Sequence, residues 1–199
     1  MINRALKIRI YPNKQQEVLI NKTLGCCRFI YNQMLNERKT VYEQNKDVEN
    51  KRIIYEWKYK SEVDYKRDFE WLKEVDSTAL QQSRNNLITA YNNFFASLKG
   101  VRKGDLVGYP KFKKKGNNDS YTSVMNILID FDKSKIKIPK IKELKFKHHK
   151  SIKSWYRLPT TVLKSVTISK TPSGKYFAAC LFAGDADYTG IPKEILKEN

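Results

Sequence analysis

Hydrophobic and polar residues alternate along the first eleven positions of the chain. Because successive side chains of an extended backbone point to opposite faces, this period of two predicts a β-strand over residues 3–11. Its two predicted sides are Leu6, Ile8 and Ile10 on one, and Lys7, Arg9 and Tyr11 on the other. Pro12 ends the strand, and Asn13 is placed to cap a following helix.

After Asn13 the hydrophobic period lengthens to three and four residues, which is typical of one face of an α-helix. That face consists of Ile20, Leu24, Cys27, Tyr31 and Met34. Gly25 lies within the pattern, and we expect it to kink or split the helix. Residues 40–66 are polar and aromatic without a clear period, so short helices and loops are expected there.

The clearest helical pattern covers residues 77–99, after a short helix at 69–75. Asp76 or Ser77 is expected to cap it, and Gly100 suits the position just past its end. The residues that follow the spacing of three and four are Leu80, Arg84, Leu87, Tyr91, Phe94 and Leu98, all but Arg84 hydrophobic.

Beyond Gly100 the period returns to two, which indicates strands. The candidates are residues 124–131, 135–139, 143–148, 162–170 and 175–183, with a turn at 171–174 joining the last two as a hairpin. One strand, a helical block and then several strands favour the α+β class. We expect a β-barrel interrupted by a helical insertion, with strand 3–11 returning to the later sheet.

The charge is strongly positive, with 39 Lys and Arg against 21 Asp and Glu among 199 residues. Residues 100–182 hold 19 of the basic groups and 5 of the acidic groups. This surplus favours a polyanionic partner. The chain has no hydrophobic run long enough for a membrane span and no signal-peptide pattern, so we expect a cytoplasmic protein with no membrane partner. Its three cysteines are expected to be buried free thiols.

A basic loop at residues 109–116 is the first candidate for phosphate contact. It contains four lysines in five residues, and Phe112 among them can anchor the loop or stack on a base. The alternative is a solvated run of charge. Hydroxyls suited to phosphates or base edges follow in residues 120–123. The loop lysines are Lys111, Lys113, Lys114 and Lys115.

The polar side of the 77–99 helix is the second candidate, because carboxamides can pair with adenine edges in the major groove. An exposed surface of biased composition is the alternative. The polar side chains are Gln81, Gln82, Asn85, Asn86, Thr89, Asn92 and Asn93. A third basic stretch, residues 133–153, holds lysines on one strand face and the adjacent His148 and His149, which are poorly arranged for metal. Asp130 and Asp132 fit a hairpin turn better than a metal pair.

Ordered sequence pieces over residues 3–183 are similar to the N-terminal half of the OrfB/TnpB family of transposon-encoded RNA-guided DNA endonucleases. Each piece alone is weak, and the ordered set is specific. The pieces are KIRIYP at 7–12, LGCCRFIYN at 24–32, WLKEVDS at 71–77, LQQ at 80–82, NNFF at 92–95, PKFKKK at 110–115, SYT at 120–122, IPKI at 138–141, VTIS at 166–169 and SGKY at 173–176.

The resemblance implies a wedge-type β-barrel interrupted by a helical recognition domain. The first wedge strand would be residues 1–12, the recognition insertion 13–100, the rest of the wedge 101–184, and the remaining stretch 185–199. It also implies binding of a guide RNA and of a double-stranded DNA motif next to the transposon. The candidate nucleic-acid contacts are Lys7, Arg9, Tyr11, Ser77, Gln81, Gln82, Asn85, the four loop lysines, Tyr121, Thr122 and Ser123.

The family's catalytic half, a RuvC-like nuclease with a zinc ribbon, has no counterpart in the 199 residues. We therefore assign no catalytic or metal-binding residue and expect no cofactor in this chain, because magnesium and zinc would belong to that other half. A separate nuclease-bearing chain is a candidate partner. The alternatives are a nuclease-deficient DNA-binding regulator and a degenerate transposase remnant.

Overall fold

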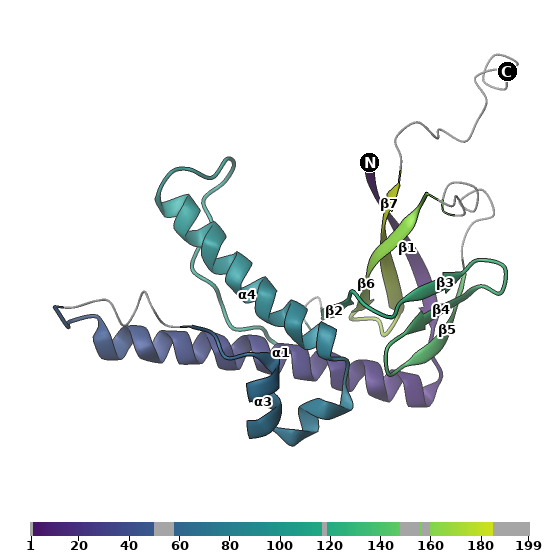
Figure 1. Cartoon of the computed structure of the whole chain (residues 1–199), viewed down its shortest axis with the longest axis horizontal. Coiled ribbons are helices and arrows are strands. Elements are labelled where there is room, and N and C mark those ends of the chain that lie inside the picture. The colour runs from purple at the N-terminus through teal and green to yellow at the C-terminus, as the bar shows by residue number, and fades with distance from the viewer. Residues whose placement is uncertain (1, 50–57, 117–118, 148–155, 157–159, 185–199) are drawn as a thin grey trace, which may run out of the picture. The chain divides into compact units, whose positions relative to one another are not determined.

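The computed structural model describes residues 2–49, 58–116, 119–147, 156 and 160–184 (Figure 1). The chain divides into two compact units. The first comprises residues 1–19 and 118–199, and the second comprises residues 20–117. The segment that forms the second unit therefore lies, in sequence, between the two parts of the first.

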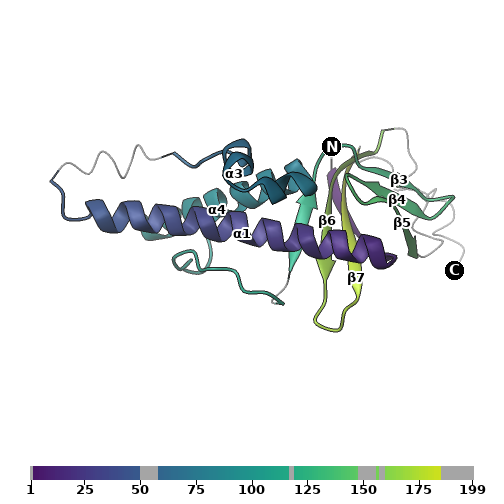
Figure 2. The same cartoon turned by 90° about the horizontal axis from the view of Figure 1, so that it is seen from below.

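The first unit is a curled, seven-stranded antiparallel sheet that forms a half-barrel (Figures 1 and 2). Its N-terminal strand pairs with strands from far along the sequence on both sides, which confirms that strand 3–11 returns to the later sheet. Among the described residues, the two outermost strands share no ladder, so the sheet is open. In spatial order the strands are β2 (Ser120–Ser123), β6 (Val162–Lys170), β7 (Tyr176–Gly184), β1 (Ile2–Tyr11), β5 (Lys142–Lys147), β4 (Lys135–Ile138) and β3 (Leu128–Asp130).

The core of the first unit lies on the inner face of this sheet. The alternation predicted for β1 is confirmed, because its three aliphatic residues are buried and the residues between them are exposed. The strands β4, β5, β6 and β7 contribute buried residues to the same core. They are Ile136, Ile138, Leu144, Phe146, Val166, Ile168, Tyr176, Ala178, Cys180 and Phe182.

Two strand predictions differ from the structure. Residues 124–131 do not form one strand, because Asn126 adopts a positive φ and only Leu128–Asp130 pair with β4. Strand β2, which was not predicted, lies earlier and pairs with β6. The predicted turn after Asp130 is confirmed, since its side chain accepts hydrogen bonds from the backbone N–H groups of Asp132 and Lys133. These bonds lower the pKa of the Asp130 carboxyl.

Helix α1 (Lys14–Asn45) begins with the predicted cap. The Asn13 side chain accepts from the Gln16 backbone, and the Gln16 side chain accepts from the Asn13 backbone. The helix runs without interruption through Gly25, so the expected kink is absent. Apart from its chain neighbours and the backbone of α1 itself, no atom lies within 4 Å of the position that a Cβ would take at Gly25.

The second unit packs three shorter helices with α1: α3 (Glu62–Asp68), the 3-10 helix η1 (Glu70–Glu74) and α4 (Ser77–Leu98). Asp76 caps α4 by accepting from the Thr78 backbone, as predicted. Small side chains let α4 approach α1 closely, because Ser83 donates to the Cys27 carbonyl at 2.5 Å and the Cys27 thiol lies 3.4 Å from the Ala79 carbonyl. All three cysteines are buried free thiols, as predicted. Within the described residues, none of the helices is both long and apolar enough to cross a membrane.

We expect Gly25→Ala to raise the free energy of unfolding by about 0.5–1 kcal/mol, because alanine loses less backbone entropy in a helix and a Cβ meets nothing there. Denaturant titration followed by circular dichroism measures the change. As a control, Gly174→Ala is expected to destabilise the chain by about 1–2 kcal/mol, because Gly174 has a φ of +77°. A loss of stability in Gly25→Ala would contradict the finding that a Cβ has room at this position.

Candidate nucleic-acid interface

The basic loop of residues 109–116 is fastened to α1 by one carboxamide. The Asn32 side chain donates to the Lys113 carbonyl at 3.0 Å and accepts from the Lys113 backbone N–H at 2.8 Å. Both hydrogen-bonding groups of this loop residue are therefore satisfied by a helix side chain, in the way that a neighbouring strand would satisfy them. Asn32 was not among the residues predicted from the sequence. The sequence offers one indication of its role, because Asn32 directly follows Tyr31 of the predicted hydrophobic face of α1.

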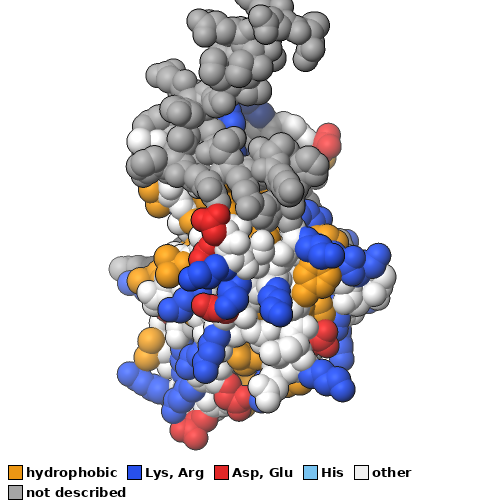
Figure 3. Space-filling model, turned by 90° about the vertical axis from the view of Figure 1, so that its right-hand side faces the viewer, with side chains coloured by type: hydrophobic (Ala, Val, Ile, Leu, Met, Phe, Trp, Pro, Cys, Tyr) orange, Lys and Arg blue, Asp and Glu red, His pale blue; other side chains and the backbone are white. Residues whose placement is uncertain are grey.

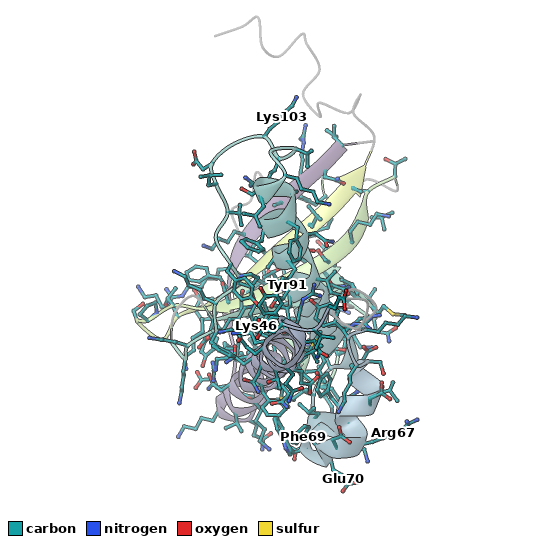
Figure 4. All side chains as sticks on the ribbon, turned by 90° about the vertical axis from the view of Figure 1, so that its left-hand side faces the viewer. Lys46, Arg67, Phe69, Glu70, Tyr91 and Lys103 are labelled. Atoms are coloured by element: carbon teal, nitrogen blue, oxygen red, sulfur yellow. The ribbon has the colours of Figure 1, made fainter. Side chains whose placement is uncertain are left out.

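Aromatic residues anchor the start of the loop. The Tyr109 hydroxyl lies 2.6 Å from that of Tyr91 on α4, and the two rings meet edge to face. Pro110 is buried. The guanidinium of Arg38 lies 4.3 Å from the centre of the Tyr91 ring and donates to the Tyr59 hydroxyl. Burial and the Tyr109 hydrogen bond raise the pKa of Tyr91. Figure 4 shows Tyr91 in the packed middle of the second unit.

With the anchoring done by its neighbours, Phe112 is left 45% exposed. The four loop lysines are exposed as well. The Lys113 ammonium lies 4.3 Å from the Tyr31 ring centre, and that of Lys39 lies 5.3 Å from the Phe112 ring centre. The loop thus presents cations and an aromatic ring together, a combination that suits phosphates and bases.

At the α3–η1 end of the second unit, by contrast, cations are paired with carboxylates. The pairs are Lys60 with Asp68 at 3.1 Å, Arg67 with Asp64 at 3.4 Å, and Lys73 with Glu70 at 2.9 Å. Arg67 and Glu70 lie at the outer edge of this end in Figure 4. The basic loop, which presents exposed lysines beside the half-exposed Phe112, is the better candidate for contact.

The outer face of the sheet forms a second basic surface, on the first unit. Residues directly opposite in an antiparallel ladder share a face. Arg9 is opposite both Lys147 and Phe177, and Tyr11 is opposite Lys145. The predicted exposure of Lys7, Arg9 and Tyr11 is confirmed. Lysine and arginine side chains spread over much of the face seen in Figure 3, with fewer carboxylates among them.

The same outer face becomes neutral and hydroxyl-rich toward β2. Thr122 is opposite Thr167, and their hydroxyls lie 2.8 Å apart. Of the three residues predicted here for nucleic-acid contact, Thr122 is half-buried on this face, whereas Tyr121 and Ser123 point to the inner side and are buried. Alternation along the strand places Thr122 on the opposite face from Tyr121 and Ser123. Of these three hydroxyls, that of Thr122 is therefore the accessible one.

On α4, Ser77, Gln81 and Asn85 follow one another at intervals of four and so share a helix face. Ser77 is exposed, whereas Gln81, Gln82 and Asn85 are half-buried. Lys66 of α3 donates a hydrogen bond to the Ser77 hydroxyl. The structure thus brings these residues together beside a lysine that was not predicted from the sequence.

In the described part of the chain, no three Asp, Glu, His or Cys residues come together as a potential metal site. The adjacent His148 and His149 lie outside the described residues.

Comparison with known proteins matches residues 1–47 to the family model HTH_OrfB_IS605, described as a helix-turn-helix domain. The chain is 31% identical over 182 residues to "Putative RNA-guided DNA endonuclease InsQ" of Escherichia coli (strain K12), covering 87% of this chain and 39% of that protein. It is 28% identical to a "Putative RNA-guided DNA endonuclease" of Streptomyces pristinaespiralis, covering 90% and 41%. It is 34% identical to "Virulence protein VsdF" of Salmonella dublin, covering 56% and 93%.

The chain belongs to the OrfB/TnpB family. It spans about two-fifths of the length of the first two of these relatives. The matched residues 1–47 do not fold here as two helices joined by a turn, because β1 is followed by the single helix α1.

We expect Asn32→Ala to release the basic loop, because it removes both hydrogen bonds to the Lys113 backbone. Limited trypsin digestion should then cut at Lys111–Lys115 several times faster, with little change in the melting temperature. Asn93→Ala, at an exposed position of α4, is the control and should digest like the parent chain. Equal digestion rates for all three proteins would show that Asn32 does not hold the loop.

Proposed function

We propose that this chain is the nucleic-acid-binding part of a TnpB-like system and that it holds a guide RNA and a DNA motif beside the transposon. The single observation that carries this proposal is the basic loop, whose exposed lysines and half-exposed Phe112 are held in place by Asn32 and Tyr109. The names of the two longer relatives point the same way, since both are described as RNA-guided DNA endonucleases.

In this proposal the first unit is the wedge and the second is the recognition domain. The cations on the outer sheet face and in the loop neutralise phosphates, which sets affinity without reading sequence. Sequence is read by the α4 face that carries Gln81, since a glutamine can pair with both polar atoms of an adenine edge.

We propose that strand cleavage, which would use magnesium and zinc, is carried out by a nuclease domain or by a separate nuclease-bearing chain. Support comes from the carboxylates of the described residues, several of which already serve turns and ion pairs, as Asp130 and Glu70 do. If the purified chain cut duplex DNA in magnesium with a guide RNA, this assignment would be overturned.

We expect the triple variant Lys113→Ala, Lys114→Ala and Lys115→Ala to weaken binding to every DNA duplex and structured RNA tested. The slope of log K against log salt should fall by about one unit for each phosphate that the variant no longer neutralises. Fluorescence anisotropy between 50 and 300 mM salt, roughly the range where such effects are resolved, gives the slope.

The matched control is the triple variant Lys60→Ala, Arg67→Ala and Lys73→Ala, which removes the same charge from residues already paired with carboxylates. Its slope should stay near that of the parent. Equal slopes for both triple variants would mean that net charge, and not the loop, determines binding. A flat salt response of the parent would reject the proposed function.

We expect Gln81→Ala to weaken binding to some duplex sequences by about 1–3 kcal/mol and to leave others unchanged, because a hydrogen bond to a base matters only where that base is present. Selection from a randomised duplex pool, followed by affinity measurement, shows the difference. Asn93→Ala, at an exposed α4 position, should keep the selected sequence. A uniform loss over all sequences would place Gln81 on the phosphate backbone instead.

A further inference from the structure

Two adjoining grooves run along α1 within the second unit, and we call them together the α1 furrow. The first has a volume of about 460 Å³ and includes Gly25, Arg28 and Gln33 in its lining. The second has a volume of about 400 Å³ and includes Lys39 and Gln44. Asn36 and Phe112 line both grooves, so the ring of Phe112 can be reached from either one.

The positions along the furrow follow the three-and-four spacing of a helix face, from Gly25 to Gln44. Gly25 leaves the first groove open, because it has no side chain and the space beside it is empty. Among the described residues that line the furrow, the one carboxylate is Glu43, and it is paired with Lys46 at 2.7 Å. The furrow therefore carries two cations, Arg28 and Lys39, against this one carboxylate, and the rings of Phe29 and Phe112 form the aromatic part of its lining.

We propose that the α1 furrow binds an unpaired segment of RNA, with a base stacked on Phe112. This proposal rests on the proposed nucleic-acid-binding function and names a site for it that was not predicted from the sequence. An aromatic ring accepts any base by stacking, and such contacts do not depend on Watson–Crick pairing. A paired base in a duplex is already stacked on its neighbours, so the ring suits an unpaired nucleotide.

The chemistry along the furrow favours RNA over DNA. The side chains of Gln33, Asn36 and Gln44 offer both donors and acceptors, and the ribose 2′-hydroxyl is itself a donor and an acceptor. Lys39 stands 5.3 Å from the Phe112 ring centre, where its ammonium can meet the phosphate of a nucleotide stacked on that ring. The basic loop that carries Phe112 continues the positive charge beside the furrow.

The experiment measures the affinity of the full chain for three labelled ten-nucleotide strands by fluorescence anisotropy. The strands are oligoadenylate RNA, oligoadenylate DNA and an RNA strand without bases. The variant Phe112→Ala should weaken RNA binding by about fivefold or more, because a stacked base contributes about 1–3 kcal/mol. Phe112→Trp should restore it. Gly25→Gln, which places a side chain in the first groove without a clash at Cβ, should weaken it as well. Abasic binding should not change in any variant.

Tyr42→Ala is the matched control, since Tyr42 is a 51% exposed aromatic of the same helix that lines neither groove. It should bind like the parent. The furrow proposal is overturned if Phe112→Ala and Gly25→Gln bind RNA like the parent, if the abasic strand loses as much as the RNA, or if DNA binds equally well. In those cases salt-dependent duplex binding by the parent would leave the proposed function standing. Binding of no strand and no duplex would end both proposals.

Discussion

The pairing of β1 with strands on both sides is the constraint on which the first unit depends. β1 joins β7 along nine residue pairs and β5 along three, so a strand from the start of the chain lies in the middle of the sheet. Because successive side chains of a strand alternate, burial of the aliphatic side of β1 places the residues between them on the outer face of the sheet. Lys7 and Arg9 are therefore exposed for the same reason that Leu6, Ile8 and Ile10 are buried.

A related separation of tasks holds in the second unit. Tyr109 and Pro110 anchor the loop in the aromatic cluster, and Asn32 binds its backbone, while Phe112 and the loop lysines stay exposed. Positive charge at the α3–η1 end is matched by carboxylates within the same helices. The surface of the second unit therefore has two kinds of positive charge. The lysines of the basic loop are exposed, whereas cations at the α3–η1 end lie beside carboxylates.

Sequence patterns predicted the parts of the fold that local periodicity determines. The sides of β1, the hydrophobic face of α1, the Asp76 cap and the 171–174 turn are as expected, with Gly174 at positive φ. The prediction from Gly25 was wrong. A glycine destabilises a helix mainly through backbone entropy, and the packing of the buried residues on either side offsets that loss of stability. Strand β2 was missed because four residues without a hydrophobic run give no signal until β6 lies beside them. The burial of Tyr121 and the contact of Asn32 with Lys113 likewise depend on segments that are distant in the sequence.

The bond between Asn32 and Lys113 has a consequence for how the loop can vary. A carboxamide matches the donor and acceptor of one peptide unit, and an aspartate at that place would offer no donor. The contact is made to main-chain atoms, so it does not depend on the side chain at position 113, except that proline there would have no N–H to donate. The position of the loop is therefore set separately from the side chains that it presents, whereas deletion of one residue between Pro110 and Lys113 would change which side chains point outward.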